Sequence, residues 1–368
     1  MGKTARDYQN EGIDWLAQTF RGILKCPAGG GKTFIATSAI DRVARGHQRA
    51  AKARITWLAN TREQVEQAEE AFSFFPAINQ LCRVRVACWQ GGSDCSEEDL
   101  VVVDECHHAG APTLGALVAT APRARWGLSA TPFGGDPEKN LALMALFDHQ
   151  MFEIDRARIV DGGHLTKARV HLHSDTDPGI AEIIEDALPK LLEERMKRFR
   201  HLDEVEQRQR ITWQLCQTHG IVRNYVRNRR VISLASQNDA ALVLVGTVDH
   251  GAMLAEEIEG AVVCHSKMGV KRRREAIAAF RDGSLRCMIA TSLADEGLDV
   301  PRASTLILAC AGRSAAKVEQ RTGRVLRTFA GKEHGIIHDF VDRQHPMLHS
   351  QHKSRLRLYK KLGYEISQ

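Results

Sequence analysis

One stretch decides which fold this sequence predicts: CPAGGGKT at residues 26–33. It follows a short apolar segment, residues 22–25, and precedes a helical pattern over residues 33–44. Glycines let backbone N–H groups curl around phosphate oxygens without a Cβ clash, and the start of the helix adds the positive end of its dipole. In this strand, loop and helix context the stretch predicts a phosphate-binding loop.

The residue types in the loop suit the binding of ATP. Its phosphates would be cradled by the backbone of the three glycines, Gly29, Gly30 and Gly31. The Lys32 ammonium would reach the β- and γ-phosphates, and the Thr33 hydroxyl would ligate Mg²⁺. Cys26 stands where the general pattern has its first glycine, so the sequence departs from the pattern there.

Around this loop, apolar runs alternate with helical patterns, which favours a parallel sheet covered by helices. The first half has expected strands at 22–25, 54–59, 84–88, 100–103 and 125–128, and helices at 33–44 and 62–75. The same rhythm returns with strands at 241–245, 261–264, 286–290, 304–309 and 335–339, and helices at 251–259, 271–282 and 315–326. Between residues 180 and 230, dense charge together with apolar residues at helical spacing predicts a helical insert. The predicted fold class is α/β, with two parallel-sheet domains flanked by helices.

We expect four parts along the 368 residues: a first domain over 1–168, a connector and helical insert over 169–235, a second domain over 236–340 and a basic tail over 341–368. With 43% apolar and 26% charged residues, the composition is that of a globular protein without a bilayer-spanning run. Nine cysteines without a CxxC pair argue against a zinc framework and indicate a reduced, cytoplasmic protein. The net charge of +6 is compatible with a polyanionic partner.

A second stretch, LVVVDECH at residues 100–107, runs four apolar residues into two carboxylates. It predicts a buried strand that ends at the carboxyl edge of the sheet, where open α/β sheets bind ligands. Asp104 would hold Mg²⁺ through water, and Glu105 would orient or deprotonate the attacking water. A solvated acidic strand end is the alternative for Asp-Glu alone. Of His107 and His108 we expect one to couple to the site and the other to be exposed.

At this point the sequence resembles a known family. DECH at 104–107 is similar to the DEAH-type box of superfamily 2 helicases, and GLSATP at 127–132 is similar to their Ser-Ala-Thr motif. In that family the Ser-Ala-Thr motif links nucleotide state to the nucleic-acid groove, a role the resemblance gives to Ser129 and Thr131.

Two further motifs of the first half carry the same resemblance. LANTREQ at 58–64 resembles the motif that contacts the backbone of one nucleic-acid strand, which implies contacts from Thr61 and Arg62. RDYQ at 6–9 resembles the segment that reads adenine, which implies nucleotide binding by Arg6 and Gln9, with the Gln9 amide on the base edge.

In the second half, IATSLADEGLDVP at 289–301 resembles the family's fifth motif. The resemblance puts Thr291 near the nucleic-acid backbone, and Gly297 and Asp299 near the ribose and the lower cleft.

QRTGRVLR at 320–327 resembles the family's sixth motif. The resemblance implies that Gln320 takes part in coupling to nucleic acid. On a helix, Arg324 and Arg327 are three residues apart and share one face. In this family that spacing presents two arginines across the cleft to the γ-phosphate, where guanidinium groups neutralise developing charge. An amphipathic helix with solvated arginines is the alternative for the spacing alone.

Together, these motifs run in the family's order from Gln9 to Arg327. They imply two tandem RecA-like P-loop domains with ATP and Mg²⁺ between them, in an ATP-dependent helicase or translocase. We expect its partner to be nucleic acid, DNA rather than RNA, and we expect a monomer that binds no membrane. The acidic box and the connector VDGGHL at 160–165 resemble the branch with excision-repair helicases, phage helicases and restriction-enzyme motor subunits.

Three alternatives stay open beside this interpretation. The first is a duplex translocase or remodeller, and the second is a motor subunit of a restriction or defence complex, neither of which separates strands. The third is a non-catalytic nucleic-acid-binding scaffold. The intact set Lys32, Glu105, Arg324 and Arg327 argues against it.

Basic clusters outside the motifs have two open interpretations, a phosphate contact or a solvated helix face. They comprise Arg223, Arg227, Arg229 and Arg230 in the insert, the run 271–274, and Arg343, Lys353, Arg355, Arg357, Lys360 and Lys361 in the tail. A tail helix could instead pack on the second domain through Leu356, Leu358 and Leu362.

Overall fold

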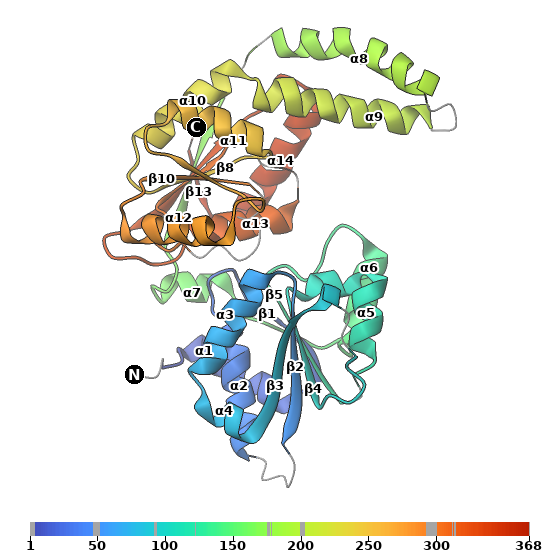
Figure 1. Ribbon diagram of the computed structural model, residues 1–368, viewed down its shortest axis with the longest axis vertical. Helices are drawn as coiled ribbons and strands as arrows, with labels where there is room; N and C mark the ends of the chain where they lie inside the picture. The colour runs from blue at the N-terminus through green and yellow to red at the C-terminus, as the bar shows by residue number, and fades with distance from the viewer. Residues whose placement is uncertain are drawn as a thin grey trace. The chain divides into compact units, whose positions relative to one another are not determined.

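The computed structural model describes residues 4–46, 52–91, 94–121, 123–174, 177, 179–198, 203–291, 300–310, 312 and 314–367. The chain divides into two compact units, Met1–Leu165 and Thr166–Gln368 (Figure 1). Each unit is built on its own parallel sheet. None of the helices described in the structure is both long and apolar enough to cross a membrane.

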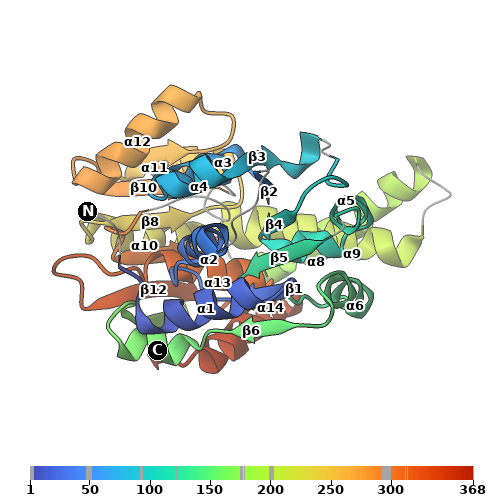
Figure 2. The same ribbon diagram turned by 90° about the horizontal axis from the view of Figure 1, so that it is seen from below.

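The first unit contains a six-stranded sheet in the order β3-β2-β4-β5-β1-β6, and its six strands are labelled in Figure 2. Every strand pairing in it is parallel. The strands are β1 (Arg21–Lys25), β2 (Ala53–Ala59), β3 (Cys82–Cys88), β4 (Leu100–Asp104), β5 (Ala124–Ser129) and β6 (Met151–Glu153). The five predicted strands are therefore confirmed, and β6 is a sixth strand that was not predicted.

Helices of the first unit follow the strands as expected for a parallel sheet. They are α1 (Asp7–Gln18), α2 (Lys32–Gly46), α3 (Arg62–Ser73), α4 (Pro76–Leu81), α5 (Pro112–Ala119), α6 (Pro137–Leu146) and α7 (Arg156–Asp161), with short 3₁₀ turns η1 (Trp89–Gly91) and η2 (Cys106–Gly110). The helix predicted to reach residue 75 ends at Ser73, because Pro76 starts a new helix and proline disfavours helical backbone in the residue before it.

The second unit contains a seven-stranded parallel sheet in the order β13-β7-β12-β11-β8-β10-β9. Its strands are β7 (Lys167–His173), β8 (Ala241–Leu244), β9 (Val262–Cys264), β10 (Cys287–Ala290), β11 (Thr305–Leu308), β12 (His334–Phe340) and β13 (Glu365–Ser367). Five match predicted strands. The other two, β7 and β13, come from segments that we assigned to the connector and the tail, and β7 pairs along its whole length with β12.

Helices of the second unit confirm the predicted helical insert. They are α8 (Gly179–Arg198), α9 (Glu204–Leu215), the π-helical turn η3 (Cys216–Val222), α10 (Tyr225–Ser236), α11 (Val248–Glu257), α12 (Val270–Asp282), α13 (Ala315–Arg324) and α14 (Pro346–Lys361). In Figures 1 and 2, α8 and α9 lie side by side. Ile184, Leu188 and Leu192 of α8 bury one face of that helix against Ile211 and Leu215 of α9.

Two arginines of the basic clusters are buried in a salt-bridge network, which corrects both interpretations given for them. Arg227 is 2% exposed and its guanidinium lies 2.5 Å from Asp342, while Arg355 is 1% exposed and lies 2.8 Å from Asp339. Buried charges persist where carboxylates and carbonyls pair with them. These side chains therefore anchor α10 and α14 to the sheet. The tail packs on the second unit, with Leu358 buried and Leu356 and Leu362 half-buried.

Candidate active site

The loop between β1 and α2 has the backbone that phosphate binding requires. Gly29 and Gly31 have φ values of +86° and +90°, in the left-handed region that favours glycine. A Cβ atom on Gly30 would lie 2.5 Å from Cys26 Sγ, and one on Gly31 would lie 2.6 Å from Gln9 Nε2. The turn therefore favours glycine at 29 and 31, and close packing favours it at 30 and 31.

The start of α1 braces this loop from one side. The Gln9 side-chain amide and the Tyr8 hydroxyl each donate a hydrogen bond of 3.2 Å to the Gly30 carbonyl oxygen. Gln9 Oε1 accepts the Arg6 N–H at 3.0 Å. The structure thus brings Arg6 and Gln9 to the phosphate loop, while their predicted contacts with adenine stay a prediction.

The acidic pair lies at the carboxyl edge of the same sheet. Asp104 ends β4, and Glu105 follows it with φ +48° and ψ +54°, a left-handed conformation that costs a residue other than glycine about 1–3 kcal/mol. This turn brings Glu105 Oε1 to 3.6 Å from Lys32 Nζ, with both side chains nearly covered. The phosphate loop and the acidic box, predicted separately, therefore meet in one site.

Electrostatics in this cluster separate the two carboxyl groups. Burial and the charge of Glu105 together raise the pKa of Asp104 to about 7, against the opposing charge of Lys32. Burial also opposes ionisation of Glu105, but Lys32 and His107 outweigh it and hold the Glu105 pKa well below its usual range. Burial would lower the pKa of Lys32, yet the carboxylates of Glu105 and Asp104 hold it above its ordinary value. Glu105 and Lys32 form an ion pair beside a carboxyl group that is poised to titrate.

A hydrogen-bonded chain joins the acidic box to the Ser-Ala-Thr motif. Ser129, the last residue of β5, donates from Oγ to Glu105 Oε2 at 3.4 Å and accepts the Thr131 N–H at 3.1 Å. His107 Nδ1 lies 3.4 Å from the same hydroxyl and 3.5 Å from Glu105 Oε2. His108 is half-buried beside the His107 ring, so the predicted exposure of one histidine is wrong.

The residues fit magnesium and a phosphate chain. Thr33 lies in the first turn of α2 next to Lys32, and its hydroxyl and the Asp104 carboxylate are oxygen donors of the kind that Mg²⁺ prefers. The glycine backbone supplies a turn open to phosphate oxygens at a helix start.

Thr61, predicted to contact nucleic acid, also has a structural role in the first unit. The Thr61 hydroxyl accepts the Gln64 N–H at 3.3 Å and caps α3, while Arg62 is exposed on the first turn. Asn60, just before them, accepts hydrogen bonds from Trp89 Nε1 at 3.1 Å and Gln90 Nε2 at 2.8 Å. Sequence reasoning missed this link between the ends of β2 and β3, because Trp-Gln carries no motif.

In the second unit, the fifth and sixth motifs lie on separate elements. Thr291 follows β10 and is buried, and Gln320 is half-buried on α13. Gly297 and Asp299 lie outside the described residues.

The expectation that Arg324 and Arg327 share one helix face is wrong. The α13 helix ends at Arg324, and the Leu326 carbonyl then accepts both the N–H of Thr166, at 2.8 Å, and its hydroxyl, at 3.2 Å. Gly335 makes this exit possible, since a Cβ atom there would lie 2.5 Å from the Val325 carbonyl oxygen. Arg324 is buried, and burial lowers the pKa of Arg327.

Comparisons with known proteins agree with this geometry. Two family models match the chain, the res subunit of type III restriction enzymes over residues 2–85 and the helicase conserved C-terminal domain over residues 223–329. "Putative helicase 22" of Sulfolobus islandicus filamentous virus is 27% identical over 373 residues, which cover 91% of this chain and 64% of the viral protein. The chain is thus similar to helicases of superfamily 2.

Two further comparisons cover most of the chain. "DNA 3'-5' translocase XPB2" of Sulfurisphaera tokodaii is 24% identical, over 88% of this chain and 78% of that protein. The crystal structure of the Hef helicase domain from Pyrococcus furiosus superposes with a TM-score of 0.59 at 16% identity, covering 95% of this chain and 98% of that one. The fold is therefore the predicted pair of tandem RecA-like domains, and the relation to excision-repair and restriction-type motors is confirmed.

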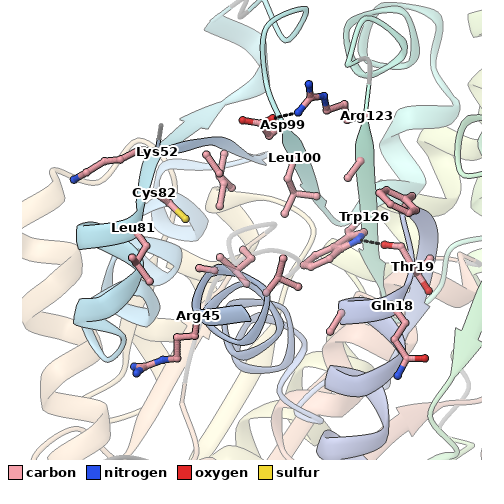
Figure 3. Close-up of a pocket in the computed structure, with 18 of the residues that line it drawn as sticks. Gln18, Thr19, Arg45, Lys52, Leu81, Cys82, Asp99, Leu100, Arg123 and Trp126 are labelled. Atoms are coloured by element: carbon pink, nitrogen blue, oxygen red, sulfur yellow. Dashed lines mark hydrogen bonds and ion pairs between the residues drawn. The ribbon is translucent and has the colours of Figure 1, made fainter. Parts of the chain in front are cut away.

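A cavity of about 630 Å³ lies elsewhere in the first unit (Figure 3). Its lining includes Ala53, Leu100 and Ala124, which begin or nearly begin strands β2, β4 and β5, so it opens at the amino edge of the sheet. The phosphate loop and the acidic box follow the carboxyl ends of strands. The cavity contains no predicted site residue and takes no part in the candidate active site.

Proposed function

We propose that this chain is a DNA-dependent ATPase that moves along DNA or unwinds it. One observation carries the proposal: Lys32, Glu105 and Ser129 form a single connected cluster at the carboxyl edge of the first sheet. A phosphate-binding lysine and an anionic carboxylate that can orient water are what hydrolysis of a terminal phosphate needs.

In the first unit, Lys32 would bind the β- and γ-phosphates, while Thr33 and Asp104 would hold Mg²⁺, which when bound neutralises phosphate charge. The Glu105 carboxylate accepts a hydrogen bond from the attacking water and orients it. In the free protein Lys32 is paired with Glu105 at 3.6 Å, so nucleotide binding exchanges that pair for a lysine–phosphate contact. Adenine contacts would come from Arg6 and Gln9.

Coupling to DNA would run through the chain from Glu105 to Thr131. Ser129 forms hydrogen bonds with both the water-orienting carboxylate of Glu105 and the backbone of Thr131. A movement of the Thr131 backbone would therefore shift the Glu105 carboxylate through Ser129. Nucleic-acid contacts would come from Thr61, Arg62, Thr291 and Gln320.

The second unit would complete hydrolysis with Arg324 and Arg327, whose guanidinium groups neutralise charge on the transferred phosphoryl group. Gly297 and Asp299 would lie near the ribose. The order of the motifs along the chain supports this assignment. Turnover would then depend on both units, which makes it sensitive to DNA bound across them.

DNA is favoured as the polymer because a relative that matches most of this chain is named as a DNA 3'-5' translocase. The same name favours a second candidate function, translocation on duplex DNA without strand separation. Strand displacement on forked DNA and triplex displacement on blunt duplex separate the two.

The proposed function is tested by the ATPase rate with no polymer, single-stranded DNA, duplex DNA, forked DNA and RNA, with Lys32→Ala as the inactive control. We expect DNA to stimulate the wild type by at least about tenfold and RNA to stimulate it less. A rate indifferent to every polymer, or a Lys32→Ala variant with full activity, would refute it.

A further inference from the structure

The ammonium group of Lys332 is held inside the second unit by three backbone carbonyl groups. Its Nζ donates hydrogen bonds to the carbonyl oxygens of Pro301, Ala303 and Arg327, at 3.0, 2.6 and 2.8 Å. An ammonium group has three N–H donors, so all of its donors are used. No carboxylate forms an ion pair with Lys332 within the part of the chain that the structure describes.

Those three carbonyls belong to two segments that the sequence separates. Pro301 and Ala303 lie in a tight turn, closed by the bond from the Ala303 N–H to the Val300 carbonyl at 3.0 Å, and this turn directly follows residues 292–299 of the fifth motif. Arg327 is the last residue of the sixth motif. Lys332 is therefore a cross-link between the exits of the two motifs.

A turn over residues 329–332 directs the Lys332 side chain toward these carbonyls. Gly331 has φ +77°, and the Lys332 N–H donates to the Phe329 carbonyl at 3.0 Å, so residues 329–332 turn back toward Arg327. Burial, reinforced by the charge of Arg327, lowers the pKa of Lys332 to about 8. Keeping a cation beside another cation without a carboxylate is costly, and the three carbonyl bonds offset that cost.

We propose that Lys332 is a positioning residue for ATP hydrolysis, which ties the Arg327 backbone to the turn at the end of the fifth motif and so sets where the Arg327 guanidinium acts. This inference rests on the proposed function. A neutral side chain at 332 would leave three carbonyls without their donor, and the segment that carries Arg327 would lose its link to the turn. Binding of ATP by the first unit would be unaffected.

The test compares Lys332→Met with Lys332→Arg, which keeps a donating cation, and with Lys190→Met as a control at an exposed lysine of the same unit. We expect K332M to lower the kcat of DNA-stimulated ATPase by at least about tenfold with KM for ATP within about threefold of wild type. K332R recovers a large part of that loss, and K190M is unchanged. Thermal melting of each variant shows whether it is folded at the assay temperature, and K332R carries the test if K332M is not.

A double-mutant cycle distinguishes positioning from a general structural role. If Lys332 acts through Arg327, then K332M lowers single-turnover hydrolysis by less than about twofold in an Arg327→Ala background. The proposal is overturned if K332M alone stays within twofold of wild type, if K332R is no faster than K332M, or if the two losses multiply. A wild type without DNA-stimulated turnover refutes the proposed function itself, whereas an active wild type with an unaffected K332M refutes the role of Lys332 alone.

Discussion

Glu105→Gln is expected to remove most ATP turnover while strengthening nucleotide binding. In the free protein the Glu105 carboxylate pairs with Lys32 at 3.6 Å, with side chains only 12% and 13% exposed. A phosphate must displace this carboxylate to reach the lysine. Glutamine keeps the shape of the side chain and loses its charge. The substitution therefore removes both the carboxylate that competes with phosphate for Lys32 and the group that orients water.

Both magnitudes follow from this geometry. Unit charges at 3.6 Å attract by about 4–5 kcal/mol at an effective dielectric of 20, and desolvation offsets most of that, leaving about 1 kcal/mol. Removing the competitor therefore tightens nucleotide binding by about fivefold. Loss of the water-orienting carboxylate lowers kcat by about 10²–10⁴.

Two assays measure these effects, titration with a fluorescent ATP analogue and steady-state ATP hydrolysis with saturating DNA. Glu153→Gln is the matched control, because Glu153 forms an exposed ion pair with Lys25 in the same unit. The reasoning is refuted if E105Q binds nucleotide more weakly than wild type, or if its kcat falls by less than about tenfold while E153Q is unaffected.

Three further substitutions test other parts of the structure. Gly335→Ala places a Cβ atom against the Val325 carbonyl, and should lower the free energy of unfolding by about 1–3 kcal/mol in urea titrations and slow ATP hydrolysis; unchanged values would show that the exit of α13 relaxes easily. Asp104→Asn should stabilise the nucleotide-free protein by about 1–3 kcal/mol at pH 8, because the Asp104 pKa is raised to about 7 and the wild type therefore loses stability as the pH rises from about 4 through 7. Parallel wild-type and D104N urea stabilities across that pH range would contradict it. Arg227→Met leaves Asp342 without one of its partners in the core and should cost about 3–5 kcal/mol in thermal or urea unfolding, whereas a loss below 1 kcal/mol would mean that water reaches the site.

Local pattern predicted the glycine loop and the acidic end of β4. Positive φ at Gly29 and Gly31 follows from the loop between a strand and a helix, and the position of Asp104 follows from an apolar strand that ends there. These features depend on residues a few positions apart, so they can be read along the chain. Charge alone was a poor guide to exposure. Arg227 and Arg355 are buried because each pairs with a buried carboxylate, Asp342 and Asp339 respectively, and these pairs are not evident from the sequence.

By itself, the sequence determined the two α/β rhythms, the glycine loop and the acidic strand end, because backbone preference and apolar periodicity act within one turn or one strand. Only the tertiary structure decided that β7 and β13 complete the second sheet, that Arg327 lies beyond its helix, and that Lys332 meets carbonyls from two motifs. Those outcomes depend on partners that are distant in the chain, as in the pairing of Lys167 with His334, and the energies of such contacts exist only once the chain has brought the partners together.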